Sequence, residues 1–481
     1  MTPFSWHWKT RAARRLRARV ALLSLTFLAL AGCGEDPGID PAIILAGPAT
    51  GEVQFVNLIP DAPELTIAVG TNAATVDYRD ATVNQGLPLD DYTMTVSFQG
   101  AAGETIVLFE DIPFRIDDEN ELKVLLRGTV ANPSFHIQDL RDPKLVGQVA
   151  EGTQQVWVAG GLATTESYDV YVTDSRVQVS EVAPTLTVSG QGQTDLVTID
   201  AAPEYRFRVT AAGSNEVLFD SGDFLLPRQT RAGFALIEYF GPARSGVAPT
   251  IDAIAFSPGG SQAFPNRELP SELRVVNLVR DTPAMDVYFG STAGDPFAAG
   301  IAPLDVTPYR AINSGRVSLN LTEPGVKDQF LLESDELIIS GSFHTLLLRG
   351  RGALGALQTI TYPQLPRAIR GRVPVTVINA SDQLDVVRVE LLAPGQDFRT
   401  TGSATDLGTG GIQGALLEPG DVDLVVLTLA DVLIYGPERV SLEEGRFYTM
   451  ILSEREVGGT VAADVITLVE DTVEPRTLST L

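Results

Sequence analysis

Residues 92–99 decide the fold class, and they read Tyr92-Thr93-Met94-Thr95-Val96-Ser97-Phe98-Gln99. Successive side chains of a β-strand point to opposite faces of the sheet, so this apolar/polar alternation predicts a strand with one buried face. The pattern recurs three times, with apolar positions at Tyr205-Phe207-Val209, Val317-Leu319-Leu321 and Val422-Leu424-Val426. The chain therefore repeats a β-rich unit four times.

Two further landmarks recur with this strand. A short apolar run follows it and begins at Val107, Val217, Phe330 and Val432, at intervals of 110, 113 and 102 residues. Another apolar run opens each unit, beginning at Val53, Val156, Leu273 and Val373. Short β-branched and aromatic runs between Gly, Pro, Asp and Asn turns are typical of a β-sandwich of about 100 residues. We predict an all-β fold of four tandem β-sandwiches, immunoglobulin-like or transthyretin-like.

Stretches that lack these strand patterns, together with the N-terminal segment, divide the chain into six parts. We predict a signal peptide over residues 1–32, a flexible tether over 33–51, and β-sandwich domains over 52–148, 152–262, 270–366 and 372–481. Units one and three resemble each other most, which suggests two copies of a two-domain module.

Composition excludes several classes of protein. The 481 residues include 35 Lys and Arg against 61 Asp and Glu, for a formal net charge of −26. Nucleic acid is a poor partner for such a chain, because its binding depends on clustered basic residues that neutralise phosphates. The single cysteine excludes a disulfide scaffold and a cysteine-built metal site.

The N-terminus carries the sharpest signal. An arginine-rich stretch precedes an apolar run over residues 20–30, which is shorter than the roughly 20 residues that a transmembrane helix needs. The run ends in Leu30-Ala31-Gly32-Cys33, which resembles the lipobox of bacterial lipoproteins. That resemblance implies cleavage before Cys33 and attachment of diacylglycerol and a further acyl chain such as palmitate to this residue. The protein would then be held at the membrane of the cell envelope, without spanning it.

Gly34 after the cysteine fits sorting to the outer membrane, where the protein would be periplasmic or surface-exposed. Two alternatives to lipidation stay open: an ordinary cleaved signal with a chance cysteine, and a short buried helix. Export by the twin-arginine route is a separate possibility. The pair Arg14-Arg15 would serve that route, but most of the flanking residues of its motif are missing.

The openings of units one and three share a motif in which Asn is followed by Asp and Pro, four and six residues later. Its members are Asn57, Asp61 and Pro63 in unit one and Asn277, Asp281 and Pro283 in unit three. These stretches resemble the opening of the DUF4397 domain, a family of unknown function found in secreted and lipid-anchored bacterial proteins, often in tandem. Units two and four depart from the motif, and the resemblance implies no catalytic residues.

Few residues are suited to catalysis. Outside the signal peptide the chain has two histidines, His136 and His344, in different units. We interpret both as strand residues in place of apolar ones; the alternative is a ligand or general-base role. Two histidines in different units therefore argue against Ser-His-Asp catalysis and against histidine-centred metal sites. Neither G-x-S-x-G nor a phosphate-binding G-x-x-x-x-G-K-[ST] occurs.

Acidic clusters remain as candidate sites. They comprise Asp117-Asp118-Glu119-Asn120-Glu121, Glu333-Ser334-Asp335-Glu336 and Glu443-Glu444, which we place in the same turn of units one, three and four. We interpret them as solvated turns. Clustered carboxylates can also hold Ca²⁺ through six to eight oxygens, so calcium binding is the alternative.

These observations predict a non-catalytic, lipid-anchored envelope protein that has a binding, adhesion or scaffold role. We expect no catalytic residues, no metal and no cofactor. Its partners would be the membrane, through the N-terminal lipid, and an unidentified envelope protein or glycan. The alternative is a carboxylate-dependent hydrolase that acts on envelope polysaccharide, which would need two carboxylates converging in a cleft.

Overall fold

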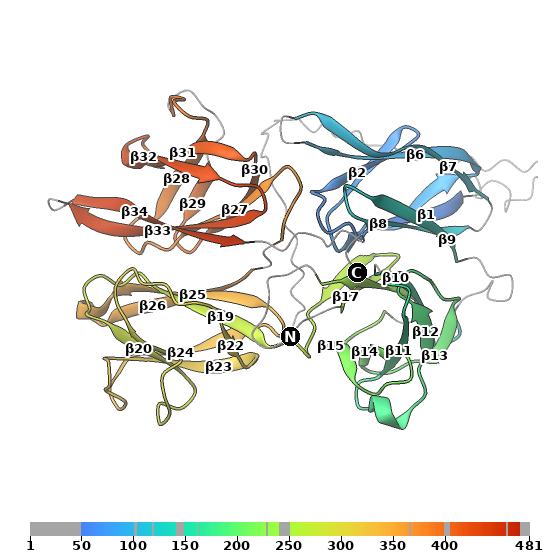
Figure 1. The fold of residues 1–481 in the computed structure, drawn as a ribbon, viewed down its shortest axis with the longest axis horizontal. Coiled ribbons are helices and arrows are strands. Elements are labelled where there is room, and N and C mark those ends of the chain that lie inside the picture. The colour runs from blue at the N-terminus through green and yellow to red at the C-terminus, as the bar shows by residue number, and fades with distance from the viewer. Residues whose placement is uncertain are drawn as a thin grey trace, which may run out of the picture. The chain divides into compact units, whose positions relative to one another are not determined.

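A computed structural model describes residues 50–471, except 101–102, 118–119, 141–148, 163, 228, 240–250, 365–366, 399–404 and 458–459. Over these residues the chain forms four tandem β-sandwiches, as predicted, and its helices are two single 3₁₀ turns (Figure 1). No helix in this part of the chain is long and apolar enough to cross a membrane.

Each sandwich consists of a mixed sheet, which contains one parallel strand pair, and an antiparallel sheet. In unit one the mixed sheet has the order β4 (Asp80–Ala81), β1 (Thr50–Asn57), β8 (Glu121–Gly128), β9 (Pro133–Asp139), with β5 (Gln85–Pro88) also paired to β1. The antiparallel sheet has the order β3 (Asn72–Val76), β2 (Leu65–Val69), β6 (Asp90–Gln99), β7 (Thr105–Ile116).

Unit two has the same number of strands in each sheet, but the fifth strand of its mixed sheet extends the sheet at the edge where the mixed sheet of unit one ends. Its mixed sheet has the order β13 (Val197–Asp200), β10 (Thr153–Gly161), β16 (Arg231–Glu238), β17 (Ile251–Ser257), β18 (Gly260–Phe264). Its antiparallel sheet has the order β12 (Leu186–Ser189), β11 (Ser167–Asp174), β14 (Tyr205–Ala211), β15 (Val217–Phe224), and η1 (Val179–Glu181) lies between β11 and β12 in the chain.

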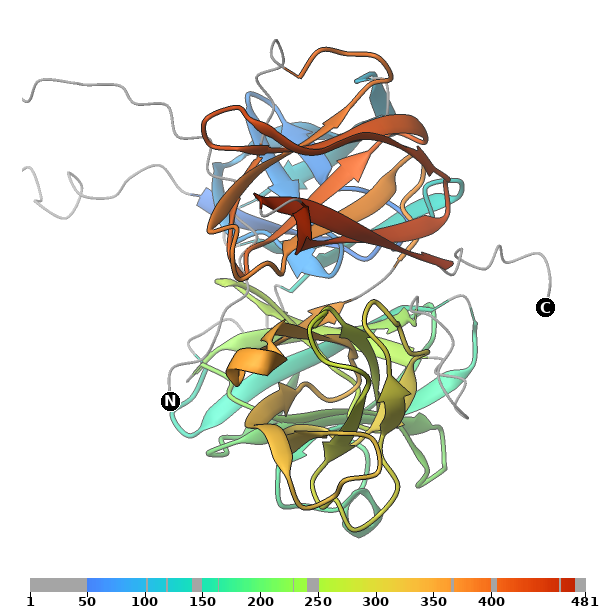
Figure 2. The same cartoon turned by 90° about the vertical axis from the view of Figure 1, so that its left-hand side faces the viewer.

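Units three and four have four strands in each sheet. Figure 2 shows unit three in yellow to light orange and unit four in orange to red. The mixed sheet of unit three has the order β22 (Arg310–Ile312), β19 (Ser271–Asn277), β25 (Phe343–Arg351), β26 (Ala356–Gln364), with η2 (Gly352–Leu354) before β26. Its antiparallel sheet has the order β21 (Ala298–Ile301), β20 (Met285–Phe289), β23 (Gly315–Thr322), β24 (Phe330–Ile338). The mixed sheet of unit four has the order β30 (Ile412–Leu417), β27 (Val373–Asn379), β33 (Arg446–Val457), β34 (Thr460–Asp471). Its antiparallel sheet has the order β29 (Thr405–Gly408), β28 (Val386–Leu392), β31 (Gly420–Thr428), β32 (Leu433–Leu442).

The first strand of every unit pairs in parallel with one later strand of its mixed sheet, which is the penultimate strand in units one, three and four and the third from last in unit two. The equivalent registers are Val56 with Leu125, Ala159 with Ala235, Val276 with Leu347, and Ile378 with Ile451. The sequence landmarks fall on matching strands: the alternating strands are β6, β14, β23 and β31, and each has an antiparallel partner that carries the following apolar run. The four units therefore share one topology.

A separate apolar core fills each sandwich between its two sheets. The apolar side of the alternating strand faces this core: Met94, Val96 and Phe98 are buried in unit one. In unit two Phe207 stacks on Phe234 of the mixed sheet, with 4.5 Å between ring centroids. Alternation along one strand thus identified the core face correctly.

Two further apolar clusters lie on the outer faces of the mixed sheets and join neighbouring units. One combines Val56, Leu58 and Leu125 of unit one with unit-two residues that include Trp157 and Phe256. The other combines residues of units three and four: Val276, Leu278, Leu347, Tyr362, Ile378, Ala380 and Ile451. Because the same strand positions are buried in both clusters, units one and two form one pair and units three and four another. The two-domain module suggested by the sequence is therefore an actual packing unit.

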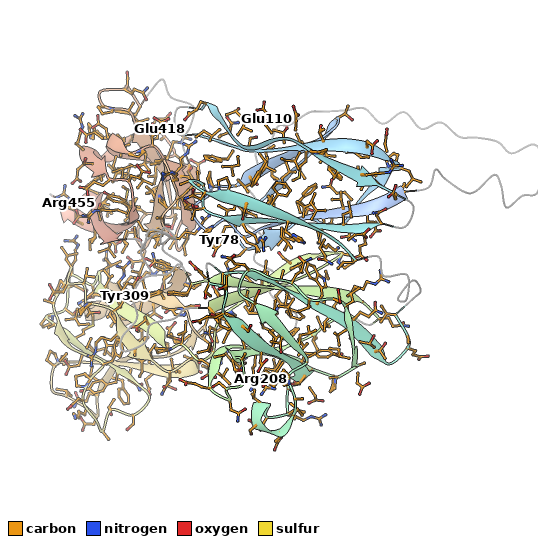
Figure 3. The ribbon with its side chains drawn as sticks, turned by 45° about the vertical axis from the view of Figure 1, so that its right-hand side comes forward. Tyr78, Glu110, Arg208, Tyr309, Glu418 and Arg455 are labelled. Atoms are coloured by element: carbon orange, nitrogen blue, oxygen red, sulfur yellow. The ribbon has the colours of Figure 1, made fainter. Side chains whose placement is uncertain are left out.

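The segment between units three and four contacts unit one. The guanidinium of Arg367 donates to the carbonyl oxygens of Pro60 at 2.6 Å and Ala62 at 3.0 Å, and it lies 5.0 Å from the ring centroid of Tyr78 (labelled in Figure 3). The backbone N–H of Arg370 also donates to the carbonyl oxygen of Asp61 at 2.9 Å. This linker is thus a packed element of the structure.

Candidate functional site

The lipobox residues Leu30, Ala31, Gly32 and Cys33 lie outside the described residues, as do the signal peptide and nearly all of the tether. The lipidation of Cys33 therefore stays a prediction from the sequence.

The asparagine of the family motif is a buried backbone clamp. In unit one Asn57 accepts a hydrogen bond from Ile59 N at 3.0 Å and donates from Nδ2 to Val76 O at 3.3 Å. Asn277 makes the same bonds in unit three, from Val279 N at 3.0 Å and to Ile301 O at 2.9 Å. Since a buried backbone N–H without a partner is costly, these amides hold the end of the first strand against the opposite segment.

Unit four has the same clamp, although its sequence departs from the rest of the motif. Asn379 accepts from Ser381 N and donates to the carbonyl oxygens of Leu384 and Leu407. Unit two has Gly160 at this position, where a Cβ would come within 2.2 Å of Gly190 O. In unit two the backbone at Gly190 therefore occupies the space that the asparagine side chain fills in the other units.

The aspartate of the motif fixes the turn after the penultimate strand. Asp61 accepts from Val130 N at 2.8 Å, and Asp281 accepts from Gly352 N at 2.9 Å and Ala353 N at 3.1 Å. Asp61 is buried beneath the linker, and this burial raises the pKa of its carboxyl. Asp281 is exposed.

The prolines follow the same division, since Pro63 is buried and Pro283 is exposed. Asn57 and Asn277 end the first strands of their units, and the aspartates and prolines of the motif lie in the turn segments that follow. Their hydrogen-bonding groups are used by the fold itself, and they do not converge on an open surface.

The two histidines occupy the strand positions expected for them. His136 pairs with Leu125, just as Ile254 pairs with Ala235 and Ile360 with Leu347. Burial, followed by the charge of Arg127, lowers the pKa of His136. Its ring thus belongs to the face that packs unit one on unit two.

His344 is fully buried, and its Nε2 accepts a hydrogen bond from Ile339 N at 3.0 Å. Tyr448 of unit four, at the equivalent position, accepts from Glu443 N with its hydroxyl and donates to Ser441 O. His344 is therefore a polar turn cap, and not merely a substitute for an apolar residue.

The acidic cluster of unit three was assigned wrongly to a turn. Glu333 to Glu336 lie within strand β24, where Glu336 accepts hydrogen bonds from the hydroxyls of Thr359 and Thr361 on β26. Burial alternates along this strand, since Glu336 and Ile338 are buried and Asp335 and Leu337 are exposed, but the run of polar residues conceals this pattern in the sequence. Within the described residues, no three His, Cys, Asp or Glu side chains are placed to hold a metal ion.

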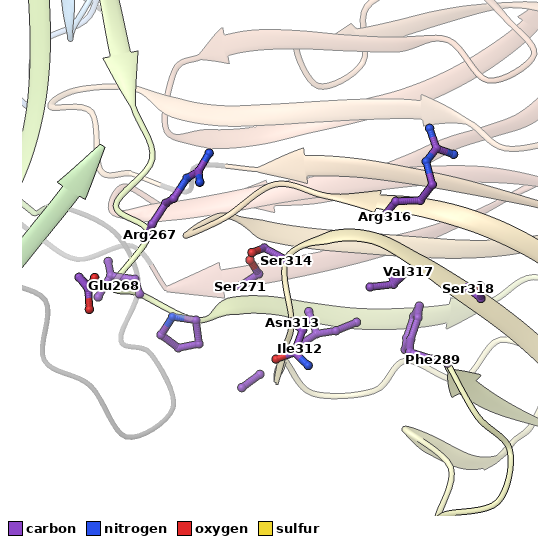
Figure 4. A pocket seen from close by; sticks show the side chains of 14 residues that line it. Arg267, Glu268, Ser271, Phe289, Ile312, Asn313, Ser314, Arg316, Val317 and Ser318 are labelled. Atoms are coloured by element: carbon purple, nitrogen blue, oxygen red, sulfur yellow. The ribbon is translucent and has the colours of Figure 1, made fainter. Parts of the chain in front are cut away.

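An open hollow of about 850 Å³ lies where the segment after unit two meets unit three (Figure 4). Arg267 and Glu268 come from that segment, Phe289 ends β20, and Asn313 and Arg316 flank the start of β23. Three serines complete much of the polar lining: Ser271, Ser314 and Ser318. The lining is mostly polar, with one aromatic ring.

The charged side chains that line the hollow differ in how closely neighbouring groups surround them. Arg267 lies against Gly222, where a Cβ would come within 1.9 Å of its Nε, and the φ of +67° at Gly222 is a backbone conformation that favours glycine. Arg316 is 72% exposed and lies 3.9 Å from Asp335, a distance at which an exposed ion pair contributes little. Partial burial, followed by the charge of Asp220, raises the pKa of Glu268.

Sequence reasoning did not find this hollow. Its lining comes from the segment around Pro270 and from strand ends some 20 to 50 residues later in the chain. The signal that the sequence offers is a long gap in strand pattern before unit three, from Gly259 to Glu272. Strand β18 occupies the start of that gap.

No curated protein matches this chain. Among solved structures, the Bacillus anthracis TIE protein matches at 11% identity and a TM-score of 0.15, covering 84% of this chain and 67% of its own. A proposed cell adhesion protein from Bacteroides ovatus matches at 8% identity and a TM-score of 0.16, covering 68% and 100%. Another from Bacteroides uniformis matches at 12% identity and a TM-score of 0.16, covering 66% and 98%. At these TM-scores the matches carry no argument about function.

One family model matches the chain, over residues 271–390, which run from the start of β19 in unit three into β28 of unit four. This segment contains Asn277, Asp281 and Pro283, the residues on which the resemblance was based. Residues 271–390 thus match the family described as Domain of unknown function (DUF4397), as the motif predicted.

Proposed function

We propose that this protein is a non-catalytic binding protein of the cell envelope, anchored by a lipid on Cys33, which binds a glycan or a partner protein through its tandem β-sandwiches. The observation that supports this proposal is the polar hollow of unit three. Binding sites are concave and present a few convergent polar groups beside apolar or aromatic surface.

A glycan is the ligand that the lining favours. The ring of Phe289 is half-buried and packs edge-on against Phe297, with 5.1 Å between centroids, so its orientation is fixed. A fixed aromatic face can cover the apolar face of a sugar. Asn313, Arg316 and the neighbouring serines supply hydrogen-bond donors and acceptors for hydroxyl groups.

The hydrolase alternative receives no support from this hollow. Glycoside hydrolysis needs two carboxyl groups about 5 to 10 Å apart. Among the residues that line the hollow, Glu268 supplies the single carboxylate. We therefore retain binding as the function.

The test compares the secreted part of the wild-type chain with Phe289→Ala and Arg316→Ala on a glycan array and in pull-downs from envelope extract. Arg176→Ala is the matched control, since Arg176 is an equally exposed, ion-paired arginine of unit two. We expect Phe289→Ala to weaken binding at least tenfold and Arg176→Ala to leave it unchanged. Equal binding by all variants would move the site away from the hollow, and turnover of any bound glycan would contradict a non-catalytic role.

The anchor is tested separately. Replacing Cys33 with Ser should release the protein into the soluble envelope fraction and abolish incorporation of labelled fatty acid. Membrane retention without label would contradict lipidation.

A further inference from the structure

Lys123 is a buried amine in a chain that has only four lysines. It lies on β8 of unit one, and its side chain is 3% exposed. Its Nζ contacts three oxygens: Asn84 Oδ1 at 2.8 Å, Gln54 Oε1 at 2.9 Å and Glu121 Oε1 at 3.1 Å. A buried amine thus lies beside two carboxamides and a carboxylate.

Asn84 lies between β4 and β5, and a second carboxylate holds the other end of its amide. Asn84 Nδ2 donates to Glu52 Oε2 at 2.5 Å, and its backbone N–H donates to Pro258 O of unit two at 2.8 Å. The carboxamide is therefore fixed between the amine of Lys123 on its oxygen side and Glu52 on its nitrogen side.

We propose that Lys123 and Asn84 become joined by an intramolecular isopeptide bond within unit one. In this reaction Nζ of Lys123 attacks Cγ of Asn84, the new Nζ–Cγ bond forms, and the bond from Cγ to Nδ2 breaks. The former amide nitrogen leaves as ammonia. No oxidation or reduction takes place.

The protons balance through the two carboxylates. Nζ gives up two of its three protons in becoming a secondary amide, the first to Glu121. Nδ2 carries two protons and takes up one through Glu52 to leave as ammonia, which binds the other as ammonium. Two protons thus leave Nζ and two reach the leaving nitrogen. Glu121 passes its proton to solvent and Glu52 takes one from solvent, so both carboxylates return to their starting states. General acid–base groups at hydrogen-bond distance are what such a transfer needs.

The surroundings of Lys123 favour the nucleophilic form. Burial lowers the pKa of its amine, although the charge of Glu121 opposes this shift. Desolvation activates lysine nucleophiles by making the neutral amine more accessible. The fixed contact replaces a bimolecular encounter, which raises the effective concentration of the reacting groups.

Asn84 is the reacting carboxamide, although Gln54 is as close to Nζ. The Nε2 of Gln54 donates to the backbone carbonyl oxygens of Thr82 at 2.6 Å and Ser257 at 2.7 Å. A carbonyl cannot supply a proton to a leaving nitrogen, whereas Glu52 on Asn84 can. Gln54 is therefore an orienting group for the lysine.

The bond would tie β8 to the segment before β5 and close a loop between residues that are 39 positions apart. A covalent link of this kind restricts the unfolded chain, as a disulfide does. The segment that it fixes also contacts unit two, through the backbone bond from Asn84 to Pro258. The cross-link would thus stabilise the interface of the first pair in a chain whose single cysteine cannot form an internal disulfide.

Mass spectrometry of the purified full chain tests this directly. We expect a mass lower than the calculated one by one ammonia, and a branched tryptic peptide in which Lys123 is joined to Asn84 and not cleaved. Lys123→Met and Asn84→Ala should each show the full calculated mass. Lys327→Met, which removes an exposed lysine, should retain the loss of ammonia.

Glu52→Gln separates chemistry from folding, because both reacting side chains remain. We expect this variant to show the full calculated mass; a cross-link that forms regardless would overturn the proton transfer assigned to Glu52. A wild-type protein with an unmodified Lys123, cleaved by trypsin after this residue, would overturn the isopeptide bond itself.

Discussion

Asn57 shows how one side chain determines the path of the chain at the end of a strand. Its amide satisfies two buried backbone groups, Ile59 N and Val76 O. The same clamp recurs at Asn277 and Asn379, while Gly160 replaces it where a loop backbone fills the space. The motif on which the resemblance to the family rests is therefore a folding device.

We predict that Asn57→Ala destabilises unit one by about 1 to 3 kcal/mol, because it leaves buried backbone groups without partners. Thermal or urea unfolding of the wild-type and variant chains measures this difference. Asn313→Ala is the control, since Asn313 is exposed on unit three and should change stability by less than about 0.5 kcal/mol. Equal effects of the two substitutions would contradict the clamp.

At the scale of elements, the turn before the penultimate strand has a pH-sensitive cap in unit three and a pH-insensitive one in unit four. Burial lowers the pKa of His344 below its ordinary value of 6.5. The unfolded chain therefore binds the proton more readily than the folded one. Stability from this group is complete above about pH 6.5 and is lost as the pH falls from there towards the folded pKa.

His344→Tyr should remove this loss, because Tyr448 caps the equivalent turn without titrating in that range. The measurement is the unfolding free energy of both proteins between pH 8 and pH 5, and we expect their difference to grow in favour of the variant as the pH falls. His136→Phe, in unit one, serves as the control for histidine removal in the other pair. A constant difference between wild type and His344→Tyr across this range would contradict the assignment.

The sequence predicted the elements well where a local period exists. The alternation at Tyr92 to Gln99 identified both the strand and its core face. It failed at Glu333 to Glu336, where four polar residues in succession hid a strand that is exposed on one side. The hollow could not be predicted, because strand ends distant in sequence form it together with a linker.

For the whole molecule, the outer apolar clusters change the expected unfolding behaviour. Separate cores alone would predict four independent units, but the buried faces around Trp157 and Tyr362 couple them in pairs. The contact of Arg367 with unit one is formed across 307 residues of sequence, a separation over which no local pattern carries information.

We therefore predict that Phe207→Ala and Leu319→Ala act on different transitions in calorimetry. Each side chain is fully buried in its own core, and its truncation typically costs about 2 to 5 kcal/mol. Phe207→Ala should lower the transition shared by units one and two, and Leu319→Ala the transition shared by units three and four. Hydrogen exchange assigns each transition to its strands. A single common transition lowered by both substitutions would contradict separate pairs.

The parallel pairing of β1 with β8 has a mechanical consequence. A pull on the chain ahead of Thr50 acts along the length of β1, which is paired to β8 over six residues. Such a load shears all of these hydrogen bonds together, whereas a pull across a hairpin would open them one after another. Strands loaded in shear yield at higher force than strands that are unzipped, so a chain held by its N-terminal end would meet tension at a strand pair that is loaded in shear.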